Sequence, residues 1–235
     1  IEEAIKTLGD SPAVLYVCRK NERIQNILRV AGAKPNVKIK RLAEAELRRI
    51  TAADHRGIAL EMGGARGGNK TEFSLFLKNL KKERATVLLL DGLTDPGNLG
   101  AVLRSCDLFD LDLLVLPTRR SAKINGTALK ASAGAGVYVS YAEVNNLARA
   151  IRELKEHDFW VYGADVEGEP VWSVKFPPRV ALLLGSEGGG LGRLTSEHCD
   201  QMVTIPTGGH IDSLNVSVAA GILLYELRRR SVSPV

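Results

Sequence analysis

The chain reads IPTGGHIDSLNVSVAAGILLYELRRR from Ile205 to Arg230. A short apolar segment ends at Ile205, a turn rich in proline and glycine follows, and a helical pattern begins near Asn215. Loops that join a strand to the next helix are the usual ligand-binding places in α/β domains. The alternative is a plain helix cap, which needs only one residue such as Ser213 or Asn215. This stretch alone leaves both interpretations open.

Five apolar runs indicate the fold class. They have the β-branched and leucine-rich composition of buried parallel strands, and helical patterns separate them. The runs are 86–90, 113–116, 159–162, 180–184 and 201–205, and the helical patterns are 99–109, 124–133, 145–156 and 195–199. This alternation predicts an α/β domain with a doubly wound parallel sheet. No G-x-G-x-x-G follows a predicted strand, so we do not expect a nicotinamide or flavin enzyme.

The first 82 residues differ in charge from the rest. They carry 17 Lys and Arg against 9 Asp and Glu (+8), residues 83–235 carry 15 against 18 (−3), and the two sum to +5. A basic region of this kind binds a polyanion such as nucleic acid, or is simply a solvated face. We expect a small α/β domain at 1–62, a linker at 63–82 and the main domain at 83–235. The segment GGARGGNK at 63–70 is not a P-loop, because its Lys and the following Thr lie one residue out of register.

Cysteine and histidine usage limits the chemistry further. The three cysteines (18, 106 and 199) and four histidines (55, 157, 198 and 210) lack the spacing of a zinc site or disulfide framework. We therefore expect no metal and a reducing, cytoplasmic environment. No run approaches the roughly 18 apolar residues of a membrane helix, and no secretory signal is recognisable. Because residue 1 is not Met, we expect that the chain begins inside a longer one.

Three loops leave the carboxyl ends of predicted strands, where open α/β sheets bind ligands. The first, DGLTDPGNLGAVLRSC at 91–106, contains Asn98, which suits a helix cap, and Arg104, which is unusual in an otherwise apolar helix. The second, GSEGGGLGRL at 185–194, has five glycines, which allow a backbone to approach a ligand closely. Glu187 is its one carboxylate. The third is the stretch that follows Ile205.

These loops contain three long motifs. They are D-P-x-N-x-G-A-x-x-R-S at 95–105, L-x-G-S-E-G-x-G-L at 183–191 and I-P-x-x-G-x-x-x-S-L-N-V-S-V-A-A at 205–220. With these motifs, in this order, the sequence resembles the SpoU-type, or TrmH-like, RNA ribose 2′-O-methyltransferases of the SPOUT superfamily. The basic first part resembles the small, ribosomal-protein-like RNA-binding domain of the branch that methylates guanosine in 23S rRNA. In HRGIAL at 55–60, Arg56 replaces the Gln that is more usual in that branch.

The resemblance implies a fold, a cofactor and a partner. Proteins of this family have a deep trefoil knot in the C-terminal parallel-sheet domain, an exception to the rule against knotted chains. They bind S-adenosyl-L-methionine at the knot, without a metal, and form homodimers. The matching positions are Gly185, Ile205 and Leu214 for the cofactor, and Asn98, Arg104, Glu187, Ser213 and Asn215 for the catalytic set.

The resemblance also implies a function: methyl transfer to a ribose 2′-hydroxyl in RNA, most naturally a guanosine of large-subunit rRNA. Arginine stays protonated, so we expect Arg104 to bind a phosphate and stabilise the developing alkoxide. Asn98 and Glu187 hold it in position, and Ser213 and Asn215 orient the ribose or the cofactor. The alternatives are a tRNA guanosine methyltransferase, an adenosine-directed rRNA resistance methyltransferase, and a non-catalytic RNA-binding or ribosome-assembly protein. The motifs do not specify the nucleotide, because site choice depends on RNA shape.

Overall fold

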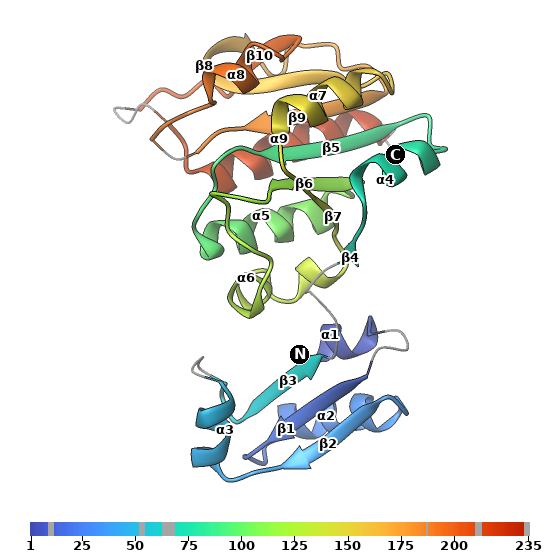
Figure 1. Ribbon diagram of the computed structural model, residues 1–235. Helices are drawn as coiled ribbons and strands as arrows, with labels where there is room; N and C mark the ends of the chain where they lie inside the picture. The colour runs from blue at the N-terminus through green and yellow to red at the C-terminus, as the bar shows by residue number, and fades with distance from the viewer. Residues whose placement is uncertain (9–11, 52–54, 63–68, 187, 210–212, 233–235) are drawn as a thin grey trace. The chain divides into compact units, whose positions relative to one another are not determined.

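The computed structural model divides into two compact units, Ile1–Gly67 and Gly68–Val235 (Figure 1). It describes residues 1–8, 12–51, 55–62, 69–186, 188–209 and 213–232. The boundary falls inside the predicted linker 63–82. Later residues of that segment form β4 (Asn69–Lys70) and α4 (Phe73–Asn79), which are part of the second unit.

A three-stranded sheet organises the first unit. Its elements are α1 (Glu2–Lys6), β1 (Ala13–Val17), α2 (Glu22–Gly32), β2 (Val37–Arg41), α3 (Glu44–Ile50) and β3 (Ile58–Met62). The central strand, β1, is parallel to β2 and antiparallel to β3. Alternate residues of β1, Leu15 and Val17, share a buried core with Ile24 and Ile27 of α2. The inward-facing residues of the strand, which recur at every second position, and the apolar face of the helix therefore form one core.

A seven-stranded parallel sheet organises the second unit. Besides β4, its strands are β5 (Ala85–Leu90), β6 (Leu113–Pro117), β7 (Ser140–Val144), β8 (Trp160–Pro170), β9 (Arg179–Leu184) and β10 (Gln201–Thr204). The order is β10-β8-β9-β5-β6-β7-β4, and each of these neighbouring pairs is parallel. The predicted α/β domain with a parallel sheet is confirmed.

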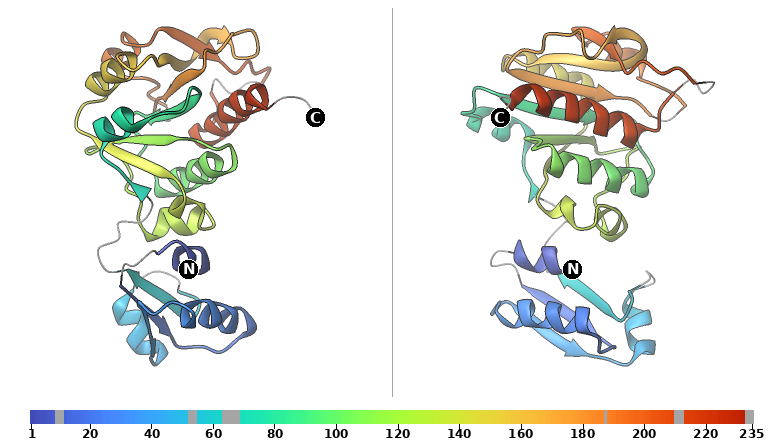
Figure 2. Two further views of the ribbon diagram at one scale, coloured as in Figure 1. Left: turned by 90° about the vertical axis from the view of Figure 1, so that its right-hand side faces the viewer. Right: turned by 180° about the vertical axis from the view of Figure 1, so that it is seen from behind.

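Helices cover both faces of this sheet. They are α4, α5 (Pro96–Leu108), α6 (Gly126–Ala131), the 3-10 helix η1 (Ala135–Val137), α7 (Leu147–Lys155), α8 (Arg193–Ser196) and α9 (Val216–Ser231). Leu88 and Leu90 of β5 share a core with α5 and α9, whereas Val87 and Leu89 share one with α4 and α7. Figure 2 shows α5 and α9 side by side on one face. None of the described helices is long and apolar enough to span a membrane.

The structure also contains strands that the apolar runs did not predict. Strand β7 has the sequence SYAEV, in which Ser and Glu interrupt the apolar pattern, and β4 is only two residues long. Strand β8 extends to Pro170, well beyond the predicted 159–162, through an irregularity in its pairing with β10. A Cβ on Gly168 would lie 2.5 Å from backbone atoms of Val203, so glycine permits this close approach.

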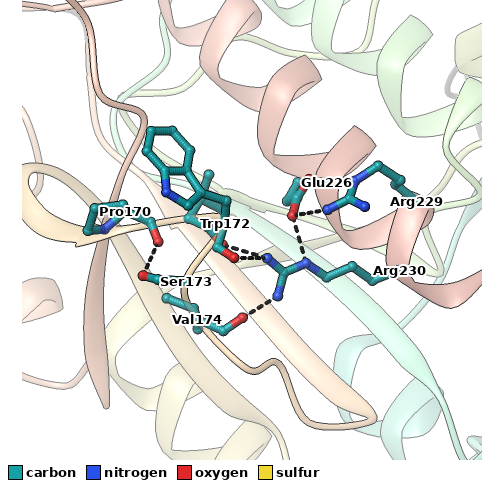
Figure 3. A network of polar contacts seen from close by, with 8 residues as sticks. Pro170, Trp172, Ser173, Val174, Glu226, Arg229 and Arg230 are labelled. Atoms are coloured by element: carbon teal, nitrogen blue, oxygen red, sulfur yellow. Dashed lines mark hydrogen bonds and ion pairs between the residues drawn. The ribbon is translucent and has the colours of Figure 1, made fainter.

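Arg230, near the end of α9, holds the segment that follows β8 (Figure 3). Its guanidinium donates hydrogen bonds to the carbonyl oxygens of Val171 (3.1 Å), Trp172 (2.6 Å) and Val174. The same group lies 5.3 Å from the centre of the Phe176 ring, as in a cation–π contact. This clamp joins the last helix to the connection between β8 and β9.

Glu226 holds Arg230 in this position. Its Oε1 accepts hydrogen bonds from Arg230 Nε at 2.6 Å and from Arg229 at 2.8 Å. Glu226 is only 9% exposed. The hydrogen bond from Arg229, together with that from Arg230, lowers the pKa of the Glu226 carboxyl group despite its burial. The carboxylate is therefore charged at neutral pH and satisfied by two guanidinium groups.

We expect Arg230→Met to lower the free energy of unfolding of the second unit by about 1–3 kcal/mol, because backbone carbonyls lose their donors. Arg229 has a side chain that is 53% exposed, so Arg229→Met should cost less than about 1 kcal/mol. Denaturant unfolding followed by tryptophan fluorescence measures both, since the two tryptophans, Trp160 and Trp172, lie in this unit. An equal loss of unfolding free energy in the two variants would contradict the stabilising role assigned to Arg230.

Candidate active site

The loops that follow β5 and β9 begin side by side. Leu90 pairs with Leu184, and the Asp91 amide donates a hydrogen bond to the Leu184 carbonyl at 2.8 Å. Asp91 Oδ2 accepts hydrogen bonds from Thr195 Oγ1 at 2.8 Å and from the Gly192 amide at 3.3 Å. Asp91 thus holds the loop after β5 against the end of the loop after β9. This role of Asp91 was not predicted from the sequence, although a carboxylate directly after a buried strand is a usable signal.

The glycine loop after β9 is a tight turn. Ser186 and Gly190 exchange two backbone hydrogen bonds of 3.0 Å. A Cβ on Gly185 would lie 2.0 Å from the Gly190 carbonyl oxygen, so position 185 cannot carry a side chain. Gly188 and Gly189 are exposed and leave their backbone open to a ligand. Glu187, a predicted member of the site, lies outside the described residues.

A hydrogen bond joins the first turns of α5 and α9. Asn215 Nδ2 donates to Asn98 Oδ1 at 3.1 Å. Asn215 also caps α9, because its Oδ1 accepts hydrogen bonds from the amide and the hydroxyl of Ser217 at 2.9 and 2.6 Å. The prediction that Asn98 caps α5 is wrong: Asp95 is the cap, with its Oδ2 2.6 Å from the Asn98 amide and Pro96 at the first helical position. The side chain of Asn98 is therefore available to Asn215.

The other predicted residues lie around these loops at different depths. Ile205 follows β10 and packs, half-buried, against the core; Leu214 is half-buried and Ser213 is exposed just before α9. Arg104 is exposed in the third turn of α5, about 9 Å along the helix axis from Asn98. Among the described residues, neither Arg104 nor Ser213 forms a hydrogen bond or ion pair with another predicted site residue. Within one chain, the structure therefore joins Asn98 to Asn215 and leaves Arg104 in solvent.

Two cysteine thiols near these elements are not nucleophiles. Burial raises the pKa of the Cys106 thiol well above its usual range, and burial raises that of Cys199 to about 11. Both are protonated at neutral pH and unreactive. In the described part of the chain, no three His, Cys, Asp or Glu side chains gather in a way that could hold a metal. The groups at the site are amides, hydroxyls and a guanidinium, which orient a ligand and stabilise charge.

A surface cleft beside α4 lies away from these loops. It is lined by α4 and the turn before β6, including Leu75, Phe76 and Asp112. Asp112 binds Lys82 at 2.7 Å and accepts a hydrogen bond from the Thr86 amide at 2.8 Å. These contacts place the cleft at the amino ends of β5 and β6, opposite to the site loops. None of the described site residues lines it, so we do not assign it a role in the site.

Comparison with known proteins gives consistent matches. Residues 85–225 match the model of the SpoU rRNA Methylase family. An "Uncharacterized tRNA/rRNA methyltransferase" of Borreliella burgdorferi is 40% identical over 219 residues, which cover 90% of this chain and 96% of the relative. The 23S rRNA (guanosine-2′-O-)-methyltransferase RlmB of Neisseria meningitidis is 38% identical over 216 residues, which cover 91% and 85%.

A solved structure shares the fold. It is the SpoU methyltransferase AviRb from Streptomyces viridochromogenes in complex with AdoMet, with a TM-score of 0.77. The match covers 98% of this chain and 87% of that chain at 21% identity. At this identity the similarity concerns the fold alone.

We expect Gly185→Ala to destabilise the second unit by about 1–3 kcal/mol, because the new methyl group meets the Gly190 carbonyl and forces the turn open. Gly208→Ala is the control: nothing lies within 4 Å of a Cβ at that position, so its effect should stay within about 0.5 kcal/mol. Denaturant unfolding followed by tryptophan fluorescence compares them. If Gly185→Ala were as stable as Gly208→Ala, the tight turn would be contradicted.

Proposed function

Because this chain belongs to the SpoU rRNA Methylase family, we propose that it methylates the ribose 2′-hydroxyl of a guanosine in 23S rRNA. Family membership and the relatives at 38–40% identity make the chain an RNA 2′-O-methyltransferase. The guanosine target is carried over from the Neisseria relative. The structural observation that carries the proposal is the hydrogen bond between Asn98 and Asn215, which holds two of the three motif loops together.

Gly185, Ile205 and Leu214 hold S-adenosyl-L-methionine in this proposal. The fit is supported by the tight turn at Gly185, where a side chain would collide with Gly190, and by the exposed backbone of Gly188 and Gly189 in the same loop. The AdoMet complex of AviRb, which has the same fold, provides further support. When bound, the cofactor supplies an activated methyl group on a sulfonium, so no metal is part of the proposal.

The chain's own polar groups position the reactants. Helix N-termini carry partial positive charge and free amides, and those of α5 and α9 meet where Asn215 binds Asn98. This place suits an anion such as a phosphate or a carboxylate. Ser213 is exposed directly before α9 and orients the target ribose.

Arg104 stabilises charge in this mechanism and does not remove the proton. Its guanidinium remains protonated at neutral pH. It binds the phosphate next to the target nucleotide and stabilises the alkoxide that develops on the 2′-oxygen. For Glu187 we retain a positioning role on the basis of the sequence motif alone.

A homodimer accounts for the apolar surface around Arg104. Three exposed apolar residues of α9 share one helix face: Val218, Ile222 and Tyr225. Tyr225 contacts Phe109 edge to face at 5.9 Å, and the neighbouring Leu108 is 65% exposed. Arg104 precedes Leu108 by one helical turn and so lies on the same face of α5. Contiguous exposed apolar surface of this kind is typical of an interface, and a second copy there would cover Arg104 as well.

The first unit binds the RNA in this proposal, as a ribosomal-protein-like domain. Its edge strand β2 carries Lys38, Lys40 and Arg41, all exposed. Residues 1–67, which form this unit, have a net charge of +5, obtained from 13 basic and 8 acidic residues, which favours a polyanionic partner. We place the protein in the cytoplasm, where rRNA is modified.

We also propose that the C-terminal segment forms a deep trefoil knot. Strand β10 lies at the edge of the sheet beside β8, yet α9, which follows it, packs against α5. The chain therefore returns from the edge of the sheet toward its centre. Asp91 holds the end of the glycine loop after β9 in place through Thr195 and Gly192.

Transfer of labelled methyl groups from S-adenosyl-L-methionine to separated rRNA and tRNA fractions tests the function. We expect label on a guanosine ribose of 23S rRNA. Arg104→Ala should lower kcat/KM by about a hundredfold or more, as expected for removal of one group that stabilises transition-state charge. Arg149→Ala, at an exposed position of α7, should retain full activity. Label in tRNA would contradict the assignment of 23S rRNA as the substrate, and no transfer to either fraction would contradict the proposed methyltransferase function.

A separate prediction concerns the proposed dimer interface. Ile222→Glu places a charge in the apolar surface of α9 and should convert the dimer to monomers, with loss of methyl transfer. Leu75→Glu, on the exposed surface of α4, is the control and should remain dimeric and active. Light scattering after size-exclusion chromatography measures the mass of each variant. A wild-type protein that is monomeric but active would contradict this assignment.

A further inference from the structure

The loop between β6 and α6 presents two arginines at the edge of the sheet that carries the candidate site. Strand β6 ends at Pro117 and lies beside β5 in parallel pairing. Arg119 and Arg120 follow two and three residues later, and both are exposed. The arginines therefore leave the same edge of the sheet as the loop that leads to Asn98.

Backbone hydrogen bonds fix both sides of this arginine pair. The Thr118 amide donates to the Val144 carbonyl at 2.9 Å, and the Ala122 amide donates to the Leu93 carbonyl at 2.7 Å. Leu93 and Ala122 are buried in the core of the second unit. Since Leu93 belongs to the loop that begins α5, the arginines are tethered directly to a site loop.

The nearby lysine has a structural role that the arginines do not share. Lys123 Nζ donates to the Thr118 carbonyl at 2.9 Å and pairs with Glu143 at 3.2 Å. Glu143 binds Lys70 as well, so two cations already share its carboxylate. Among the described residues, the side chains of Arg119 and Arg120 make no hydrogen bond or ion pair. Their charges are available to a partner outside the chain.

Arg120 also has a strained backbone. Its φ is 54°, in the left-handed region that non-glycine residues adopt only at an energetic cost. Glycine would occupy this position without that cost. Strain at an exposed position whose side chain makes no hydrogen bond or ion pair with another described residue points to a use of the side chain in binding.

We propose that Arg119 and Arg120 bind backbone phosphates of the substrate RNA beside the nucleotide that is methylated, an assignment that rests on the function proposed above. Guanidinium groups match phosphate geometry with paired hydrogen bonds. Residues 68–235, the second unit, carry no net charge, from 19 basic and 19 acidic residues, so two unpaired cations at this edge create a local attraction that the unit as a whole lacks. Phosphate contacts fix the position of a nucleic acid without reading its sequence. The pair therefore aligns the RNA strand with the site loops.

The double variant Arg119→Ala/Arg120→Gly tests this role. We expect the KM for 23S rRNA to rise about tenfold or more, as for loss of charged hydrogen bonds. The kcat at saturating RNA and the Kd for S-adenosyl-L-methionine should not change. In filter binding, the slope of log affinity against log salt should become shallower by about 1.4, since each lost phosphate contact removes about 0.7 for a single strand. Glycine at position 120 relieves the backbone strain, and tryptophan fluorescence during unfolding confirms that the fold is retained.

The control is Arg84→Ala/Arg149→Ala. It removes the same charge from exposed positions before β5, at the amino edge of the sheet, and on α7, and should leave the KM for RNA near its wild-type value. Arg119→Lys/Arg120→Lys should recover most of the affinity, because an ammonium still binds phosphate as a point charge.

Three results would overturn the assignment: equal KM changes in the two double variants, an unchanged KM and salt slope after Arg119→Ala/Arg120→Gly, or a fall in kcat or cofactor binding in that variant. Failure of the wild-type protein to methylate any RNA would instead defeat the proposed function. In that case the salt slopes from filter binding still decide whether the arginine pair binds RNA.

Discussion

The hydrogen bond between Asn215 Nδ2 and Asn98 Oδ1 joins two helix N-termini whose residues are 117 positions apart in the sequence. Each asparagine can take part in this contact because its helix already has an N-terminal cap. Asp95 caps α5, and Asn215 uses Oδ1 to cap α9 while its Nδ2 donates to Asn98. One side chain thus ends a loop, starts a helix and holds a second helix in place. This contact is a direct polar link between the first turns of the helices that follow two of the motif loops.

The sheet makes this contact possible. Alternate residues of β5 face two separate cores, so the central strand is fixed on both sides. On one side, α5 and α9 approach closely where a Cβ on Gly221 would lie 3.4 Å from Ser105 Oγ. At the carboxyl end, Asp91 fastens the loop after β5 to the loop after β9. The exposed backbone of Gly188 and Gly189 lies at the same edge of the parallel sheet as the N-termini of α5 and α9, and free amides at such an edge suit an anionic or polar ligand.

Much of the fold follows from the sequence, because runs such as 86–90 and 180–184 are apolar on both faces and match β5 and β9 closely. Strand β7 was not predictable in this way, since Ser140 and Glu143 interrupt its pattern. Local spacing also gave the wrong cap for α5, although Asp95 before Pro96 is the better cap signal. The loops after predicted strands indicated the polar site residues, the family resemblance supplied their roles and the cofactor positions, and only the structure joins Asn98 to Asn215. The role of Arg119 and Arg120 depends on β6 lying beside β5, which hydrophobic periodicity does not reveal.

The most direct test of the account is a double-mutant cycle on methyl transfer to 23S rRNA, with Asn98→Ala, Asn215→Ser and the double variant. Serine retains an oxygen that can cap α9 but removes the amide that donates to Asn98. We predict that the double variant loses little more activity than the worse single variant, with a coupling energy of about 0.5–3 kcal/mol. Losses that add within about 0.5 kcal/mol would mean that the two residues act independently. That result would contradict a site organised by their contact.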